Sequence, residues 1–184
     1  GYVEKGLKPV YWCASCETAL AEAEVEYADH TSTSIYVRFK FDSDSTTKIN
    51  NLVDLKGKDV YAVIWTTTPW TIPSNMAISM HPRFEYTFFD YNGDVYVIAQ
   101  GLLGSFLKDV AWEESDIKVI GSCTGSDLEL LTTKHPLVDR KSPIILGEHV
   151  TLDAGTGSVH TAPGHGLEDY EVGCKYGIEV FSPL

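Results

Sequence analysis

The residues from Phe84 to Ala99, FEYTFFDYNGDVYVIA, constrain the fold more than any other part of the chain. Two runs of aromatic and β-branched residues flank the dipeptide Asn92-Gly93. Such a dipeptide tolerates the positive φ angles of a two-residue hairpin turn, and the flanking runs have the composition of paired strands. We therefore predict an antiparallel hairpin here, in a chain with a high content of sheet.

Alternation of apolar and polar side chains recurs elsewhere in the sequence. The segment 59–65, DVYAVIW, is apolar nearly throughout, as a strand buried on both faces would be. The segment 21–27, AEAEVEY, alternates, although its Ala and Glu residues also allow a helix over 18–26. Shorter strands are expected near 117–120, 128–131, 143–146 and 178–181. The segment 34–41, SIYVRFKF, predicts a strand whose inward side chains are Ile35, Val37, Phe39 and Phe41.

Helical patterns are few. Apolar residues at helical spacing predict one helix between Gly101 and Trp112, and a second is expected over 167–176. The segment 42–48, DSDSTTK, has the composition of a polar loop. Many short strands with two or three short helices indicate a mostly β domain of the α+β class, with a closed or nearly closed barrel. At 184 residues we expect a single domain over 1–184, cut from a longer protein because the sequence starts without Met.

Charge and cysteine usage narrow the function classes. The formal net charge is −12, which argues against an autonomous nucleic-acid binder but not against a domain that receives one nucleic-acid end from a partner. The sequence contains no apolar run of membrane-spanning length and no signal-peptide pattern. Cys13 and Cys16 form one CxxC pair, whereas Cys123 and Cys174 stand alone. A zinc site needs two close pairs, so reduced cysteines are the simpler interpretation.

The stretch TGSVHTAPGHGLEDY, from Thr156 to Tyr170, concentrates chemistry in a glycine-rich loop. It fails the dinucleotide fingerprint GxGxxG because His160 occupies the third glycine position. A metal site from His160, His165 and Asp169 is conceivable, but the spacing is not HExxH. Asp169 begins a predicted helix, whose positive dipole end is expected to keep the carboxylate ionised, as a substrate ammonium group requires. The purely structural alternative is that Asp169 caps the helix and His160 is a satisfied buried imidazole.

A second stretch, VIWTTTPWTIPSNMAI from Val63 to Ile78, carries three successive threonines after a buried strand. Their hydroxyl and methyl groups suit a small polar ligand with an apolar side chain, and the two prolines stiffen the backbone. The alternative is a strand that ends in a proline turn, where threonine is common. The candidate recognition residues here are Thr66, Thr67, Thr68 and Trp70.

Together these two stretches resemble the editing domain of isoleucyl-tRNA synthetases. WTTTPWTIPSN resembles the threonine-rich element, and GTGSVHTAPGHGLEDY resembles the motif that ends in the editing aspartate. The resemblance extends through GLKPVYWCASCETALAEAEVEY and GIEVFSPL, so it covers nearly the whole chain. The second tryptophan of WTTTPWT distinguishes the element from that of valyl and leucyl relatives. HIGH-type and KMSKS-type motifs are absent from this sequence, so we do not expect amino-acid activation.

The resemblance implies a β-barrel editing domain of the valyl/leucyl/isoleucyl-tRNA synthetase type, inserted into a larger class I enzyme. Such a domain compensates for weak discrimination in the synthetic site. Isoleucyl-tRNA synthetases are the established illustration, since a missing methylene is discriminated only about 150-fold. The implied substrate is valyl-tRNA(Ile), with valyl-adenylate as a further candidate, and isoleucine is excluded by size. The implied partners are the acceptor end of tRNA(Ile) and the rest of the parent synthetase, in the cytoplasm and without a membrane.

The resemblance also implies roles for individual residues. Asp169 would bind the α-ammonium of valine, and His160 would line the side-chain pocket. The three threonines, with Trp70, would shape the pocket and bind the terminal adenosine or the attacking water. Because no serine or cysteine stands beside a base, we expect direct attack by water rather than a covalent intermediate. No cofactor or metal is expected here, ATP and magnesium belonging to the parent's synthetic site. The basic residues expected near the tRNA entry are Lys40, Lys134, Arg140 and Lys141.

Three alternatives remain open at this point. The chain can be a non-catalytic binding module that holds an aminoacyl ligand without cleaving it. It can be a zinc hydrolase built on the two histidines and the aspartate of the glycine-rich loop. It can also be a structural insert that is inactive without its parent. Turnover, metal content and activity within the parent, respectively, distinguish these alternatives from an editing hydrolase.

Overall fold

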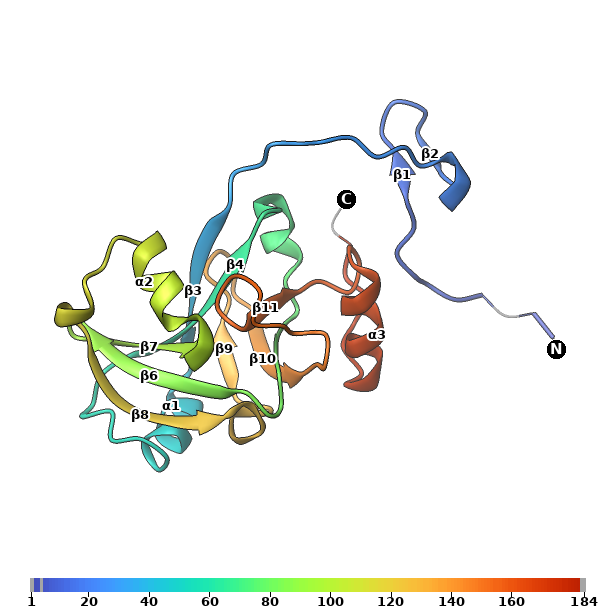
Figure 1. Ribbon diagram of the computed structural model, residues 1–184. Coiled ribbons are helices and arrows are strands. Elements are labelled where there is room, and N and C mark those ends of the chain that lie inside the picture. The colour runs from blue at the N-terminus through green and yellow to red at the C-terminus, as the bar shows by residue number, and fades with distance from the viewer. Residues whose placement is uncertain (1, 4, 183–184) are drawn as a thin grey trace.

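The structure is a computed structural model that describes residues 2–3 and 5–182. Within this part of the chain, nine strands form one mixed sheet in the order β11-β5-β10-β9-β3-β4-β7-β6-β8 (Figure 1). Two neighbouring pairs, β5–β10 and β4–β7, are parallel, and the other pairs are antiparallel. The strands are β3 (Ile35–Phe41), β4 (Val60–Thr66), β5 (Ala77–Met80), β6 (Glu85–Tyr91), β7 (Asp94–Ala99), β8 (Lys118–Thr124), β9 (Thr132–Lys134), β10 (Lys141–Leu146) and β11 (Ser158–Thr161).

The predicted hairpin is confirmed as β6 and β7. Tyr91 pairs with Asp94 across a two-residue turn, and both turn residues adopt left-handed conformations, with φ of 51° at Asn92 and 95° at Gly93. These are the angles for which Asn-Gly is favoured in hairpins. A register shift between Phe88 and Phe89 lets β6 pair with β8 on its other edge. The hairpin and β8 therefore form one end of the sheet.

The two strands at the centre of the sheet also agree with the sequence. β3 pairs with β4 from Ile35↔Thr66 to Lys40↔Tyr61. Of the inward positions expected on β3, Phe39 and Phe41 are buried, whereas Ile35 and Val37 are half-buried. β4 is buried along most of its length because it is paired on both edges and covered on both faces.

The predicted mostly β class with a few short helices is confirmed, but the predicted barrel is not closed, since the sheet is open. β11 lies beside β4, but no backbone hydrogen bonds join these two strands. β3 pairs along one edge of β4, and β7 pairs with the other edge only over Val60–Ala62. β11 lies beside β4 without extending that pairing, so the ring stays open. β11 and β8 remain the two edges of the sheet among the described residues.

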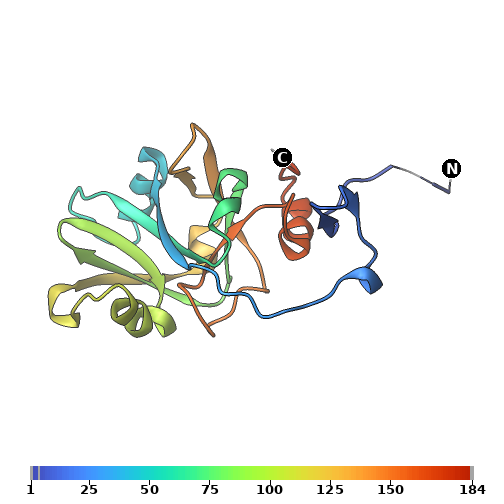
Figure 2. The same cartoon turned by 90° about the horizontal axis from the view of Figure 1, so that it is seen from above.

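The strand predicted over 21–27 is also wrong. Residues 5–34 form an N-terminal arm that extends away from the sheet (Figures 1 and 2) and contains the short hairpin β1 (Trp12–Cys13) and β2 (Thr18–Ala19). The 3₁₀ helix η1 (Glu22–Glu24) follows, and the Glu24 carboxylate accepts the Ala21 N–H at 2.7 Å. With no neighbouring strand or apolar surface to cover it, the alternating pattern does not form sheet, and Tyr27 is 81% exposed.

Three further segments differ from the sequence prediction. The segment 128–131 follows a 3₁₀ helix, η5 (Gly125–Leu128), and Leu130 has a positive φ of 59°, so its buried leucines enter the core from a turn. The segment 178–181 carries no strand. The segment 42–48, predicted as a loop, begins α1 (Ser43–Asn50). The strands β5 and β9, which have four and three residues, were too short for the periodicity analysis to identify.

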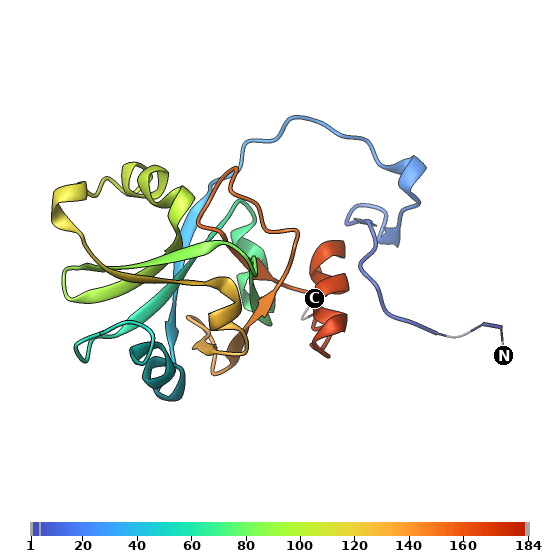
Figure 3. The same cartoon turned by 60° about the horizontal axis from the view of Figure 1, so that its bottom comes forward.

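Both predicted helices are confirmed, as α2 (Leu103–Asp109) and α3 (Leu167–Lys175). Seen with the bottom forward (Figure 3), α3 and the N-terminal arm lie at the same end of the molecule, opposite the β6–β7–β8 strands. The remaining helices are short 3₁₀ turns: η2 (Pro69–Ser74), η3 (Gln100–Leu102) and η4 (Glu114–Asp116). No helix among the described residues is both long and apolar enough to span a bilayer.

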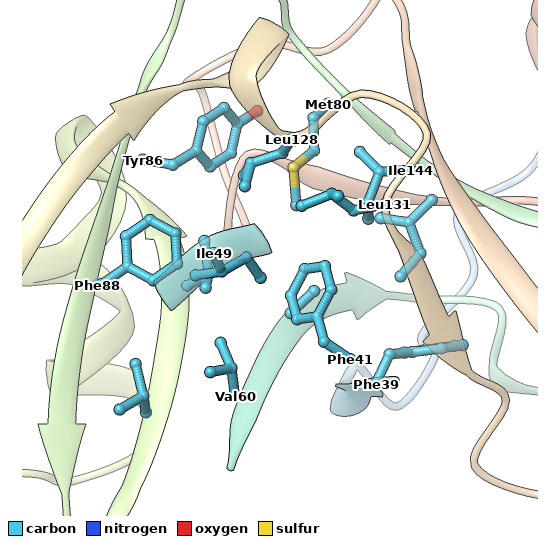
Figure 4. Packing of buried hydrophobic residues seen from close by; sticks show 14 of the residues in the cluster. Phe39, Phe41, Ile49, Val60, Met80, Tyr86, Phe88, Leu128, Leu131 and Ile144 are labelled. Atoms are coloured by element: carbon cyan, nitrogen blue, oxygen red, sulfur yellow. The ribbon is translucent and has the colours of Figure 1, made fainter. Parts of the chain in front are cut away.

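The sheet separates two apolar clusters, and β6 contributes to both of them. Phe88 points into the larger cluster with Phe39, Phe41 and Tyr86, which converge in Figure 4. Phe89, the next residue, faces the smaller cluster under α2. Each of these aromatic side chains is no more than 1% exposed. Because large aromatic side chains are buried on both of its faces, the sheet is the rigid part of the fold from which the loops extend.

Helix α1, which was predicted as a loop, is stabilised at its N-terminus by a capping residue. Asp42 is the N-cap residue, and its carboxylate accepts the Ser45 N–H at 2.9 Å and pairs with the Lys141 ammonium at 3.0 Å. Burial opposes ionisation of Asp42, but these two partners outweigh it and hold the carboxyl pKa below its ordinary value. The contribution to stability is therefore present at pH values above the unfolded pKa and is lost as pH falls through the folded pKa.

We predict that Asp42→Ala lowers the free energy of unfolding by about 0.5–2 kcal/mol at pH 7, because helix α1 loses its cap. Urea denaturation followed by circular dichroism measures this loss. Asp29→Ala, an exposed carboxylate in the arm, is the matched control and is expected to change stability by less than about 0.5 kcal/mol. Equal effects of the two variants, or no difference between the variant and the parent at pH 7, would contradict the capping role.

Candidate active site

A cleft of about 320 Å³ lies between the end of β4 and the loop that precedes β11. Two glycines of this loop adopt left-handed backbone conformations that favour glycine, with φ of 82° at Gly155 and 73° at Gly157. A Cβ on Gly157 would also overlap the side chain of Ala99. The Tyr86 hydroxyl donates to the Gly157 carbonyl at 2.5 Å, which fixes the loop to the core. The lining residues are Trp65, Thr66, Thr67, His149, Thr151, Asp153, Ala154, Gly155, Thr156, Gly157, Ser158 and Val159.

The three threonines divide between two neighbouring surfaces. Thr66 and Thr67 line the cleft, and the Thr67 carbonyl accepts a hydrogen bond from Ser32 of the arm at 2.6 Å. The Thr66 hydroxyl accepts the Thr68 N–H at 3.0 Å and lies 3.1 Å from the Thr68 hydroxyl. Thr68 is thus joined to the cleft through Thr66 but does not line it. Trp70 is 64% exposed on η2 and is outside the cleft lining, so the structure does not bring it to Thr66 and Thr67.

His160 is buried and both of its ring nitrogens are hydrogen-bonded. The Asn75 side-chain amide donates to Nδ1 at 2.9 Å, so Nε2 carries the hydrogen and donates to the Thr71 hydroxyl at 2.9 Å. The Thr71 hydroxyl in turn donates to the Thr68 carbonyl at 2.8 Å, which is consistent with this tautomer. Burial, reinforced by His135 and His165, lowers the pKa of His160 to about 4. The imidazole is therefore neutral at physiological pH.

Asn75 is the functional residue that sequence reasoning missed. Its side chain is fully buried and also donates to the Ala77 carbonyl at 2.7 Å, while its side-chain oxygen accepts the Ser142 hydroxyl at 2.5 Å. The available signal was an asparagine placed after a proline turn at the end of the threonine-rich stretch. A single sequence gives no indication that such a residue contacts a histidine 85 positions later.

Asp169 lies in the first turn of α3, as expected, but its environment differs from the expectation. One carboxylate oxygen accepts the Ala162 N–H at 2.9 Å, which ties the helix to the residue after β11. Burial raises the pKa of Asp169 above its ordinary value, although the Ala162 N–H and the nearby histidines His149 and His165 act in the opposite direction. Burial, rather than the helix dipole, therefore dominates this carboxyl group.

The metal set proposed from the sequence is not assembled. His165 is exposed and its Nε2 lies 2.8 Å from the Ser74 hydroxyl, while both nitrogens of His160 are occupied by other partners. Across residues 2–3 and 5–182, no three His, Cys, Asp or Glu side chains are placed to hold an ion together. The four cysteines are free thiols, and Cys13 and Cys16 lie on the arm, far along the fold from Cys123 on β8.

Most of the basic residues expected near a tRNA entry already have intramolecular partners. The Arg140 guanidinium donates to the carbonyls of Asn75 and Pro73 at 2.9 and 3.0 Å, so it has a structural role beside η2. Lys40 and Lys141 form ion pairs with Asp59 and Asp42, respectively. The expectation of a free basic entry surface is therefore not supported at these three positions.

His149 is a second residue of the site that the sequence analysis did not identify. It lines the cleft of Thr66 and Thr67, and it is close enough to Asp169 for its charge to lower the carboxyl pKa. It thereby connects the glycine-rich loop to α3. Of the predicted site residues, Thr66 and Thr67 line the cleft, and Thr68 contacts Thr66. His160 and Asp169 are outside the lining: His160 contacts Asn75 and Thr71, and Asp169 lies near His149.

Comparison with known proteins shows which family the chain resembles in sequence and fold. Isoleucine–tRNA ligases of Thermoanaerobacter sp. (strain X514) and Desulfovibrio desulfuricans are 54% and 50% identical to the chain over 184 residues. These alignments cover 100% of the chain but 19% of each relative, so the chain spans about a fifth of their length.

Solved structures share the fold at low sequence identity. The editing domain of the P. knowlesi cytosolic leucyl-tRNA synthetase superposes with a TM-score of 0.64 at 15% identity, covering 78% of this chain and 62% of that one. The corresponding P. falciparum domain gives a TM-score of 0.59 at 14% identity, covering 74% and 63%. The fold is therefore that of a synthetase editing domain.

The family assignment rests on sequence as well as on fold. The family model described as "tRNA synthetases class I (I, L, M and V)" matches residues 1–163, which is most of the chain. The alignments with isoleucine–tRNA ligases run through both the threonine-rich stretch and the glycine-rich loop, because they cover the whole chain. The chain belongs to the class I tRNA synthetases of the isoleucine, leucine, methionine and valine group.

Proposed function

We propose that this chain is a proofreading hydrolase that cleaves valyl-tRNA(Ile) and excludes isoleucine. The observation that carries the proposal is the cleft formed by Thr66, Thr67, His149 and the loop before β11, with the Asp169 carboxyl group close enough to His149 to be influenced by it. The likeness to isoleucine–tRNA ligases and to leucyl editing domains supports the same reaction class. The partners in this proposal are the acceptor end of tRNA(Ile) carrying valine and the rest of a cytoplasmic synthetase.

The reaction would be hydrolysis of the aminoacyl ester. Water attacks the carbonyl carbon, the bond to the ribose oxygen breaks, and valine and free tRNA leave. An ester of this kind is already activated, so orientation of the water and stabilisation of the developing negative charge supply much of the acceleration. The threonine hydroxyls and backbone N–H groups at the cleft are available hydrogen-bond donors. The proposed reaction requires no cofactor in this chain, ATP and magnesium serving the synthetic site of the parent.

Asp169 is proposed to bind the α-ammonium of the amino acid, because it is a partly buried carboxyl group whose pKa is influenced by the cleft residue His149. Its second oxygen is available, since the Ala162 N–H occupies only one. His160 is proposed to limit the size of the amino-acid pocket as a neutral wall. Its two hydrogen bonds hold the ring in one orientation, and a rigid wall discriminates a methylene better than a mobile one.

A non-catalytic binding module is the alternative that uses the same cleft. Deacylation of valyl-tRNA and isoleucyl-tRNA by the chain, with full-length parent enzyme as a positive control, separates the two. Selective release of valine supports the hydrolase. Saturable binding of the aminoacyl end without any release of amino acid, in the chain and in the parent alike, would leave the binding module instead.

We predict that Asp169→Asn lowers kcat/KM for valyl-tRNA deacylation roughly 10- to 100-fold, because a charged hydrogen bond to the ammonium group is lost. Asparagine keeps an oxygen that accepts the Ala162 N–H, so the fold is expected to be retained. Glu168→Gln, which neutralises the exposed neighbouring carboxylate, is the matched control and should retain wild-type activity. Equal rates for the two variants would remove the ammonium-binding role.

The raised pKa of Asp169 gives this site a predictable pH dependence. Binding of the ammonium needs the ionised carboxylate, so activity falls as the pH drops through the pKa of this group. Because burial raises that pKa, the acid limb of kcat/KM should lie above the ordinary aspartate range of about 3.9. A rate profile from pH 4 to 8 measures the limb, and its loss in Asp169→Asn assigns it.

We predict that His160→Ala admits isoleucine and raises isoleucyl-tRNA deacylation roughly tenfold or more, since the volume of the imidazole becomes available to one extra methylene. The matched control is Thr71→Val, which removes the hydrogen bond to His160 but leaves the ring in place. The ratio of valyl to isoleucyl rates should collapse in the first variant and fall much less in the second, which keeps the ring and its bond to Asn75. A wild-type ratio in His160→Ala would exclude His160 as the size filter.

A further inference from the structure

The N-terminal arm is hydrogen-bonded to the rest of the molecule at the candidate site. The Ser32 hydroxyl donates to the Thr67 carbonyl at 2.6 Å, across 35 positions of sequence, and Thr67 lines the cleft. Ser32 is half-buried and comes shortly before Ile35, where β3 begins. A side chain of the arm therefore holds a backbone group in the wall of the cleft.

The sheet pairing of β4 ends at Thr66, one residue before this contact. Pro69, which has no backbone N–H, follows at the start of η2. Thr68, between them, has φ of −123° and ψ of 62°, which are the angles of neither a helix nor a strand. Sheet pairing therefore does not fix the position of residues 67 and 68, and other hydrogen bonds must do so.

Two further hydroxyl groups hold this segment. The Thr66 hydroxyl accepts the Thr68 N–H at 3.0 Å. The Thr71 hydroxyl donates to the Thr68 carbonyl at 2.8 Å and accepts from Nε2 of His160 at 2.9 Å. Ser32 therefore stands at one end of a series of contacts along the threonine-rich stretch, and His160 stands at the other.

The arm also approaches the molecule at a second place. A cavity of about 440 Å³ is lined by Tyr11 and Leu20 of the arm together with His165 and Leu167 at the start of α3. Figure 3 shows the arm and α3 at the same end of the molecule. Because the arm lies beside both the threonine-rich stretch and the end of the glycine-rich loop, Ser32 reaches its partner from a defined direction.

Taking the proposed function as its basis, we propose that Ser32 is a positioning residue for the cleft. It acts through the Thr67 carbonyl and fixes the end of β4 against the loop that precedes β11. Without this hydrogen bond, residues 67 and 68 move relative to the ester, and the rate falls because orientation supplies much of the acceleration. The effect falls on kcat rather than on KM, since binding of the ammonium group is assigned to Asp169, outside this segment.

The test compares Ser32→Ala, Ser32→Thr and Ser34→Ala in the whole 184-residue chain. Alanine removes the hydroxyl, and threonine keeps a hydroxyl on the same Cβ. Ser34, an exposed serine of the same arm, provides the matched control. One readout is the kinetics of valyl-tRNA deacylation. The other is the ¹⁵N-relaxation order parameter of the backbone N–H groups of Thr67 and Thr68, with the fully buried Val97 of β7 as a reference.

In the wild type the order parameters of Thr67 and Thr68 should lie near the rigid value of about 0.85, and in Ser32→Ala they should fall toward about 0.6. Val97 should stay rigid in both. In the same variant kcat should fall about three- to tenfold, as expected for one hydrogen bond, with KM within about twofold of the wild type. Ser32→Thr should restore both readouts, and Ser34→Ala should match the wild type. A loss of global stability alone would not change motion within the folded state.

Unchanged order parameters in Ser32→Ala overturn the proposal, and so does an unchanged kcat when the wild type deacylates valyl-tRNA. Equal changes in Ser34→Ala, or no recovery in Ser32→Thr, assign the effect to the altered arm rather than to the hydroxyl and overturn it as well. If neither the wild-type chain nor the parent releases valine, the proposed hydrolase fails. The order parameters alone then decide whether Ser32 fixes the end of β4.

Discussion

The buried amide of Asn75 is the interaction on which the candidate site depends. Its nitrogen donates to His160 on β11 and to the Ala77 carbonyl at the start of β5, and its oxygen accepts from Ser142 on β10. Three strands and the end of η2 therefore meet at one side chain. An amide has two donors and two acceptor lone pairs, and no aliphatic residue of similar size could satisfy all three partners. The protonation state of His160 follows from this arrangement, since a donor at Nδ1 places the hydrogen on Nε2.

Burial influences the two titratable groups of the site in the same direction, toward neutrality. It lowers the pKa of the His160 imidazole to about 4 and raises the pKa of the Asp169 carboxyl group. The His160 imidazole is therefore neutral and is not a source of charge in the site. The Ala162 N–H and His149 act against burial and favour the ionised form of the Asp169 carboxyl group.

Sequence reasoning succeeded where the determining contacts are local. The Asn92-Gly93 turn and the aromatic runs beside it specify their own pairing, and the hairpin was predicted at the correct residues. The open sheet could not be predicted in this way, because it depends on the pairing of β4 with β7, which is not its neighbour in sequence. Helix α1 was missed because its first turn is polar and its stabilising residues, Asp42 and Lys141, are far apart in sequence. In the site, the motifs located Thr66 and Asp169, whereas Asn75 and His149 are defined only by contacts across the fold.

The separation of Asn75 and His160 by 85 residues has a consequence for how the protein forms. The β6–β7 hairpin closes over two residues, whereas the Asn75–His160 contact must wait for β5, β10 and β11 to align. Pairings between distant segments form slowly because their loop-closure entropy is lost before contacts compensate for it. A chain that emerges from its N-terminus therefore completes the sheet's hairpin end well before the end that carries the recognition residues. The order of synthesis therefore makes the candidate site the last part of the sheet to acquire its shape.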